Sequence, residues 1–376
     1  MKIRRTTPQK EAEKRIVSGK SWEEFCDTLK AAGASIMGMD SPKDPYTQAE
    51  GYRYLSRLVR AGLEAFIEYS DPKAPVLRRM VHETVKIGAD NPDNHYYNAQ
   101  ISGQYEYEIS GKRGTINFLG FSTQKGNYGG GSGLPATGFL DSSELEVESD
   151  GTVTIHVSCG KKGKNWLPME PDTNMLIVRQ TFGDRTKEVP AELSIRRVGG
   201  DGFPSPLTAE GVDNGLKTTA AFVAGVSFLF SKWAKDFRHH INQLPQMDPE
   251  KSNAAGGDPK IAYYHSYWEL QPEEALIIEV TPPECEHWNF QLNNHWMESL
   301  DYRYFPIHIN KFTARYRKDG SVRIVVAHDD PGCDNWLSTT GHTRGTMCFR
   351  WIRAEVHPQP GTKVVPLNEI KSGRER

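Results

Sequence analysis

One pattern of residues occurs twice in the chain, and this repeat limits the possible folds more than any other feature. The first copy reads DGTVTIHVSCGKKGKNWLPME from Asp150, and the second reads DGSVRIVVAHDDPGCDNWLSTT from Asp319. Fifteen residues lead from Asp150 to Asn165, and sixteen lead from Asp319 to Asn335. Such spacing is typical of a duplicated unit whose copies fold in the same way.

Further landmarks extend the repeat in both directions. A Tyr-Tyr-Asn triplet at 96–98 corresponds to Tyr-Tyr-His at 263–265, and Arg179 corresponds to Arg350. Between these landmarks the chain shows short runs of alternating apolar and polar residues, separated by Gly-rich turns, which predicts β-strands. We therefore predict a mainly β fold with helical additions. Two duplicated antiparallel β-sandwich or jelly-roll domains are joined by N-terminal and inter-domain helices.

The same patterns divide the chain into five parts. They are an N-terminal helical region at 1–90, a first β-domain at 91–205, a helical connector at 206–258, a second β-domain at 259–358 and an irregular tail at 359–376. In the N-terminal region, apolar residues at helical spacing predict two helices, and a third short helix is expected over 75–88.

Several stretches of the second copy resemble a known family. HWNFQLNNHWMESLDYRY, DGSVRIVVAH, NWL and FRWIRAE are similar to the bacterial family called domain of unknown function 1214. The resemblance covers residues 260–355 and implies a double jelly-roll fold, because related members pair this domain with a second β-domain. It implies no particular reaction.

Composition excludes several classes of function. The net charge of −2, with both signs interspersed, gives no electrostatic reason to bind nucleic acid or an anionic membrane. The five cysteines form no Cys-x-x-Cys pair, which favours reduced thiols and a cytoplasmic location. The longest apolar stretch, at 220–230, is too short to span a bilayer, and the N-terminus lacks the apolar run of a signal peptide. We expect a small-molecule substrate as the partner, and the sequence leaves a homo-oligomer open.

No motif for an organic cofactor is found. The Gly-rich stretch at 125–138 lacks the Gly-Lys-Ser/Thr of a P-loop, and we interpret it as a surface loop, with a lid over the site as the alternative. We therefore expect no cofactor.

Histidines distinguish the second copy from the first. The second copy carries His265, His287, His295, His328 and His342. Residues that only one copy has are not needed for the shared fold, so these side chains indicate where a function lies.

His328 is the first candidate. In SVRIVVAH the apolar residues alternate, and His328 falls on their face at the end of the strand. Its counterpart in the first copy is Cys159, which we expect to be buried. We predict His328 as a general base oriented by Asp330, with a buried structural histidine as the alternative.

An earlier predicted strand of the second copy presents a polar face. His287, Asn289, Gln291, Asn293 and His295 alternate with apolar residues in HWNFQLNNH. This face either lines a wet cavity, in which Asn289 binds substrate, or is a solvated outer face.

Residues at the end of that strand complete the hypothesis. His295 is a candidate acid and Trp296 a candidate substrate contact, because loops at strand ends build sites. Arg303 could hold an anion or simply pair with Asp301 or Glu298.

Aromatic residues supply the remaining candidates. Tyr264 is a candidate acid, and Trp268, Trp336 and His265 are candidate substrate contacts. Both tyrosines of the triplet recur in the two copies, which favours a structural role, whereas His265 is new in the second copy.

A metal site is an alternative use of the same histidines. His328, Asp330 and His342 superficially match a site of two histidines and one carboxylate. The neighbouring turn residues explain the acidic group without any ion.

We therefore expect a cofactor-independent acid–base enzyme, a lyase acting on a hydrophobic aromatic or polycyclic small molecule in bacterial catabolism. His328 with Asp330 would abstract a proton, His295 or Tyr264 would supply one, and Arg303 would hold an anion. The alternatives are a non-enzymatic small-molecule binding protein and a metal-dependent hydrolase or oxygenase.

Overall fold

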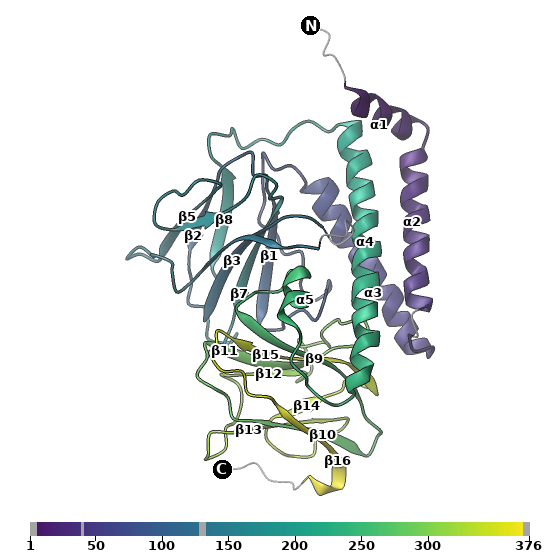
Figure 1. Ribbon diagram of the computed structural model, residues 1–376, viewed down its shortest axis with the longest axis vertical. Helices are drawn as coiled ribbons and strands as arrows, with labels where there is room; N and C mark the ends of the chain where they lie inside the picture. Colours follow the sequence, from purple (N-terminus) through teal and green to yellow (C-terminus); the bar gives the residue numbers. More distant parts are fainter. Residues whose placement is uncertain (1–5, 39–40, 128–132, 371–376) are drawn as a thin grey trace.

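The N-terminal helices and the long helix of the connector form one layer of the molecule (Figure 1). The computed structural model describes residues 6–38, 41–127 and 133–370. Its helical segments are α1 (Thr7–Val17), α2 (Lys20–Met37), α3 (Pro45–Leu63), η1 (Glu64–Glu68), α4 (Ala209–Phe237), η2 (Arg238–His240), α5 (Pro249–Ala254) and η3 (Leu367–Glu369). Figure 1 shows α2, α3 and α4 side by side, with α4 running past both β-domains. Within the described residues, no helix combines the length and apolar character that crossing a membrane requires.

The first β-domain is a sandwich of two sheets. Its strands are β1 (Asn94–Gln100), β2 (Tyr107–Lys112), β3 (Phe118–Gln124), β4 (Ala136–Asp141), β5 (Thr152–Ser158), β6 (Trp166–Pro168), β7 (Met175–Thr181) and β8 (Glu192–Arg197). One sheet has the order β1-β7-β3-β4 and the other β6-β5-β2-β8. Apolar side chains such as Ile109, Phe121 and Ile155 fill the space between the sheets, as alternation along each strand predicts.

The second β-domain has the same plan. Its strands are β9 (Ile261–Glu269), β10 (Glu274–Val280), β11 (His287–Leu292), β12 (His308–Asn310), β13 (Val322–Ala327), β14 (Trp336–Ser338), β15 (Arg344–Ile352) and β16 (Gly361–Pro366). The sheet orders, β9-β15-β11-β12 and β14-β13-β10-β16, match those of the first domain strand for strand. The prediction of two duplicated β-sandwich domains with added helices is therefore confirmed.

The repeated landmarks serve the same purpose in both copies. The side-chain amide of Asn165 accepts from the backbone N–H of Glu146 and donates to its carbonyl oxygen, both at 2.8 Å. Asn335 makes the same two bonds to Arg315, also at 2.8 Å. Each Asn thereby supplies the backbone partners that a neighbouring strand would otherwise provide. This explains why the Asn-Trp-Leu motif recurs.

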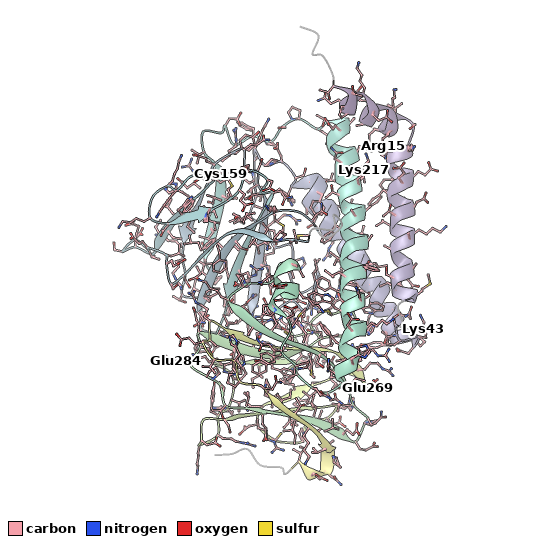
Figure 2. The ribbon with its side chains drawn as sticks, in the orientation of Figure 1. Arg15, Lys43, Cys159, Lys217, Glu269 and Glu284 are labelled. Atoms are coloured by element: carbon pink, nitrogen blue, oxygen red, sulfur yellow. The ribbon has the colours of Figure 1, made fainter. Side chains whose placement is uncertain are left out.

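Three local expectations are wrong. The segment 75–88 forms turns and short bridges instead of a helix. The tail is not irregular throughout, because β16 pairs with β10 in antiparallel fashion, as β8 pairs with β2 in the first copy. Cys159 is exposed, and Figure 2 shows it on the first β-domain, far from the helical layer.

Charged contacts fasten the helical layer at one end. Asp213, buried on α4, accepts from the Nε of Arg15 at 3.0 Å and from the Nζ of Lys217. Figure 2 shows Arg15 and Lys217 close together at this end. The contact fixes α1 against α4, so the layer is held as one unit beside the β-domains.

Candidate ligand cavity between the two β-domains

A cavity of about 550 Å³ lies where the two β-domains meet α4. Its size falls within the range of ordinary small-molecule sites. The apolar part of its wall comprises Phe66, Met80, Leu134, Met175, Ile177, Phe222, Phe230 and Trp233. We call it the central cavity.

The polar part of the wall includes two equivalent tyrosine–arginine pairs. Tyr96 on β1 lies opposite Arg179 on β7, and Tyr263 on β9 lies opposite Arg350 on β15. All four side chains line the central cavity. They are related by the duplication, so the cavity lies where the two copies present the same polar surface to each other.

Each tyrosine hydroxyl is held by the backbone in the same manner. The N–H of Asn91 donates to the Tyr96 hydroxyl at 3.0 Å, and the N–H of Asp258 donates to the Tyr263 hydroxyl at 3.1 Å. Burial raises the pKa of both tyrosines, with Asp258 adding to the effect at Tyr263. Both therefore stay protonated at neutral pH, and each keeps an O–H that can donate to a bound acceptor.

The arginines cross between the domains. Arg350 donates to the carbonyl oxygen of Ala89, which leads into the first β-domain. Arg179 donates to the carbonyl oxygen of Gly256, which leads into the second, at 2.8 Å. Ala89 and Gly256 both adopt the left-handed region, with φ of 59° and 82°. Each domain thus holds the segment that leads into the other.

The polar face of β11 is buried against the segment 89–93. His287, Asn289, Gln291, Asn293 and His295 are all buried. The Nδ2 of Asn289 donates to the Oδ1 of Asn91 at 2.6 Å and to the Oδ2 of Asp93 at 3.1 Å. The interpretation as a solvated outer face is wrong, because the first β-domain covers it. In the part of the chain that the structure describes, this face forms an interface and does not line the central cavity.

Asp93 is the centre of that interface. Its carboxylate lies 3.1 Å from the Nε2 of His287 and 3.2 Å from the Nε2 of His308, and it accepts from Asn310 at 2.9 Å. Burial alone would raise the pKa of Asp93, but the charge on His308 and the bond from His287 outweigh it and hold the pKa well below its usual range. The carboxylate is therefore ionised and joins the domains.

His265 is the predicted site residue that lines the cavity. Its ring is buried and stacks on Tyr263 at 5.8 Å, and its Nε2 lies 3.8 Å from the Sγ of Cys348. Burial, with Arg350 nearby, lowers the pKa of His265 to about 3. The imidazole is thus uncharged at neutral pH. Its counterpart is Asn98, which lines the cavity from the first copy.

The predicted base and its partner lie apart from this cavity. His328 is half-buried, with its Nδ1 2.8 Å from the Oγ1 of Thr339 and its Nε2 3.3 Å from the carbonyl oxygen of Leu270. Asp330 is exposed and accepts from the N–H of Gly332 in the turn. The structure thus does not pair His328 with Asp330. It also places both residues apart from the other predicted catalytic residues.

The two predicted acids are also separated. His295 is buried with its Nδ1 2.9 Å from the hydroxyl of Tyr267, and burial lowers the pKa of His295 to about 3. Tyr264 points into the sandwich core and donates to the carbonyl oxygen of His357 at 3.0 Å. Arg303 pairs with Asp301 at 2.7 Å, which is one of the two contacts considered from the sequence.

The predicted tryptophan contacts are packing residues. The Nε1 of Trp268 donates to Asn293, that of Trp296 to Thr47 and that of Trp336 to Ala327, in each case to a carbonyl oxygen. Trp268 and Trp296 are fully buried. Each indole thus packs in the protein and bonds the backbone, as buried tryptophans usually do.

The alternative metal set is not assembled either. The Nε2 of His342 lies 3.2 Å from the Oε1 of Glu50 on α3, and both nitrogens of His328 have protein partners. Across residues 6–38, 41–127 and 133–370, no group of three or more His, Cys, Asp or Glu side chains could hold a metal ion.

Comparison with known proteins shows a family match in the second β-domain and one solved structure that is similar over nearly the whole chain. Residues 274–356 match the family described as "Protein of unknown function (DUF1214)". An uncharacterized protein from Burkholderia cenocepacia, whose crystal structure is known, is 49% identical to this chain in sequence. The two structures superpose with a TM-score of 0.93. The match covers 95% of this chain and 99% of that one. Over residues 274–356 the chain is similar to the DUF1214 family.

The DUF1214 match lies in the second β-domain and contains Arg350, whereas the other three members of the tyrosine–arginine pairs lie outside it. The Burkholderia protein is similar over both β-domains and the helices. A protein of Vibrio parahaemolyticus, VPA0106, is 11% identical, with a TM-score of 0.46 and coverage of 84% of this chain and 98% of that one. A search of the curated proteins found no match.

Sequence reasoning missed all four residues of the tyrosine–arginine pairs as site residues and treated them only as landmarks of the repeat. The signal was present, because Tyr96, Arg179, Tyr263 and Arg350 are themselves landmarks of the repeat. We interpreted recurrence in both copies as a sign of a scaffold. A duplicated surface that faces itself across an interface can instead build a site from the repeated residues.

Proposed function

We propose that the protein binds a small molecule with an apolar body and an oxygen-bearing polar group in the central cavity. The observation that carries this proposal is that two equivalent tyrosine–arginine pairs line a cavity whose wall also carries large apolar side chains. A few polar groups that fix orientation, surrounded by apolar side chains, are the usual composition of a small-molecule site.

The chemistry of the wall favours an anionic or carbonyl oxygen. Tyr96 and Tyr263 offer O–H donors, and Arg179 and Arg350 offer N–H donors with fixed positive charge. The carboxylate of Asp90, which also lines the cavity, already accepts from the N–H and hydroxyl of Ser299 at 3.0 and 2.8 Å. A carboxylate on an aromatic or aliphatic body is the ligand class that satisfies these donors best.

The proposal can be tested with anilinonaphthalene sulfonate, a fluorescent probe that combines apolar rings with an anionic group. Asn98 lines the cavity, so Asn98→Trp fills it, and we expect probe affinity to fall by at least about tenfold, or 1.4 kcal/mol. Thr154→Trp, at an exposed position of β5, is the matched control and should bind as the wild type does. Equal binding by both variants would refute the proposal.

A second candidate is acid–base catalysis in the same cavity, as a lyase acting on a hydrophobic aromatic or polycyclic molecule. The observation that favours it is the uncharged imidazole of His265, stacked on Tyr263, whose hydroxyl keeps its proton. A neutral imidazole can accept a proton and a phenol can donate one. We also propose a cytoplasmic location. The odd number of cysteines supports it, because five thiols cannot all pair in disulfides within one chain.

His265→Gln separates the two functions. The amide keeps a polar group of similar size, so probe binding should persist within about threefold of wild type. Turnover, measured as loss of an aromatic β-hydroxy carbonyl compound by chromatography, should disappear if the imidazole acts as the base. Retained turnover in His265→Gln would exclude this candidate.

A further inference from the structure

A second hollow borders the central cavity. A groove of about 1050 Å³ lies between α2, α4 and the segment 245–255. Trp233, Ala255 and His265 line both the groove and the central cavity. A single layer of side chains therefore separates the two spaces.

A row of parallel rings leads from one space to the other. His265 stacks on Tyr263 of the central cavity at 5.8 Å and on Phe237 of the groove at 5.3 Å. The interplanar angles are 10° and 1°, so the three rings lie nearly parallel in one row. A flat or linear apolar group can pack along such a row of rings.

Trp233 is the residue of the dividing layer that can move. Its indole is half-buried and contacts Phe230 edge-on at 5.5 Å, Phe237 at 6.2 Å and His265 at 6.3 Å. Because the indole is only half-buried and its ring contacts are edge-on or tilted, it changes rotamer more readily than a fully buried ring. The backbone of Ala255 and the buried ring of His265 are more firmly fixed.

The groove itself suits an apolar chain. Its helical walls are lined by the small residues Ala31, Ala32, Ser35, Ala221, Ala224 and Gly225. Lys232, Asp236 and Lys251 are exposed along its rim, so the charged groups lie at the mouth. Small residues on both helices keep the space between them open.

We propose that the groove and the central cavity form one site for an elongated carboxylate, and that Trp233 determines the ligand length at which the groove becomes occupied. The inference rests on the proposed function. The carboxylate binds the tyrosine–arginine pairs, and a short tail ends at the indole of Trp233. A longer tail displaces the indole and extends into the groove.

The test uses saturated straight-chain fatty acids of about eight to about sixteen carbons, whose binding is measured by displacement of the fluorescent probe. Each additional methylene that is buried should lower Kd by about fourfold. In the wild type, each added methylene should give this full gain in affinity for short chains. The gain per methylene should be smaller at the length where the tail meets Trp233, and full again for longer chains. Trp233→Ala should remove the interruption.

A plug in the groove provides the second arm. Ala221 lines the groove and not the central cavity, so Ala221→Trp should weaken binding of the longest acids by at least about tenfold and leave the shortest unchanged. Ala221→Ser is the matched control. Unchanged long-chain binding in Ala221→Trp would overturn the inference.

The two hypotheses fail in different ways. If the wild type binds no acid of any length, the proposed function itself fails. If short acids bind but Trp233→Ala shows the same dependence on length as wild type, the inference about the groove fails while the central cavity stands. Should Ala221→Trp not fold, as judged by near-ultraviolet circular dichroism, the Trp233→Ala series alone decides.

Discussion

The guanidinium of Arg350 in the second β-domain bonds the carbonyl oxygen of Ala89, which leads into the first. In the opposite direction, the guanidinium of Arg179 in the first β-domain bonds the carbonyl oxygen of Gly256, which leads into the second. The two contacts are equivalent by the duplication, and together they close the interface at which the central cavity lies. Stability and the ligand binding that we propose therefore depend on the same residues.

The two arginines should differ in their effect on stability. Arg350 is buried and also bonds Asn289 and Gln291, whereas Arg179 is half-buried and bonds Ser122 and Gly256. We expect Arg350→Met to lower the free energy of unfolding by about 3 kcal/mol, because several buried acceptors lose their partner, and Arg179→Met by about 1 kcal/mol. Urea unfolding measures both. Equal losses would contradict the burial argument.

Asp93 should make stability depend on acid pH. Its pKa in the folded protein lies below its value in the unfolded chain, because His308 and His287 outweigh the cost of burial. The stabilisation is thus complete above the unfolded pKa of about 3.9 and is lost as the pH falls through the folded pKa. Unfolding followed between about pH 5 and 2.5 should show wild type losing up to about 1.4 kcal/mol per pH unit more than Asp93→Asn at the acid end. Parallel curves would show that Asp93 is not the group responsible.

The Asn-Trp-Leu asparagines should matter equally in both domains. Asn165→Ala and Asn335→Ala each remove three hydrogen bonds to backbone groups, so each should cost about 2 to 3 kcal/mol of unfolding free energy. Asp330→Ala, in an exposed turn, is the control and should change stability by less than about 1 kcal/mol. A large difference between the two Asn variants would show that the copies no longer share this contact.

His328→Ala tests the role assigned to that residue from the sequence. Its two ring nitrogens contact Thr339 and Leu270, so its removal should cost about 1 to 2 kcal/mol of stability. Probe binding in the central cavity should stay at the wild-type level, because His328 does not line it. A loss of binding without a loss of stability would return His328 to the site.

The fold was predictable because its cause is local and repeated. Alternation along each strand places Trp288 and Phe290 in the core, and the recurring Asp-Gly and Asn-Trp-Leu motifs mark equivalent turns. The strand β16 could have been found by the same argument, since β8 occupies the matching position in the first copy. The helix expected over 75–88 was wrong because the apolar residues of this segment pack in two directions. Leu77 packs against the core of the first β-domain, whereas Met80 and Val85 belong to the cluster under the helical layer.

The site was less predictable because it lies between the copies. Reasoning within one domain places Asn289 on a strand correctly but cannot show that the segment 89–93 covers it. The described ends of the Gly-rich loop, such as Gly126 and Leu134, lie in the wall of the central cavity, and residues 128–132 of the predicted surface loop or lid fall outside the described residues.

Two subunits encoded by a single gene must carry identical side chains at equivalent positions. Joining both β-domains in one polypeptide removes that restriction while keeping the shared geometry of tyrosine and arginine. Asn98 and His265 occupy matching places on β1 and β9, yet one is a neutral amide and the other an imidazole. The tandem arrangement thus gives a symmetric frame an asymmetric wall, which suits the asymmetric ligand that we propose.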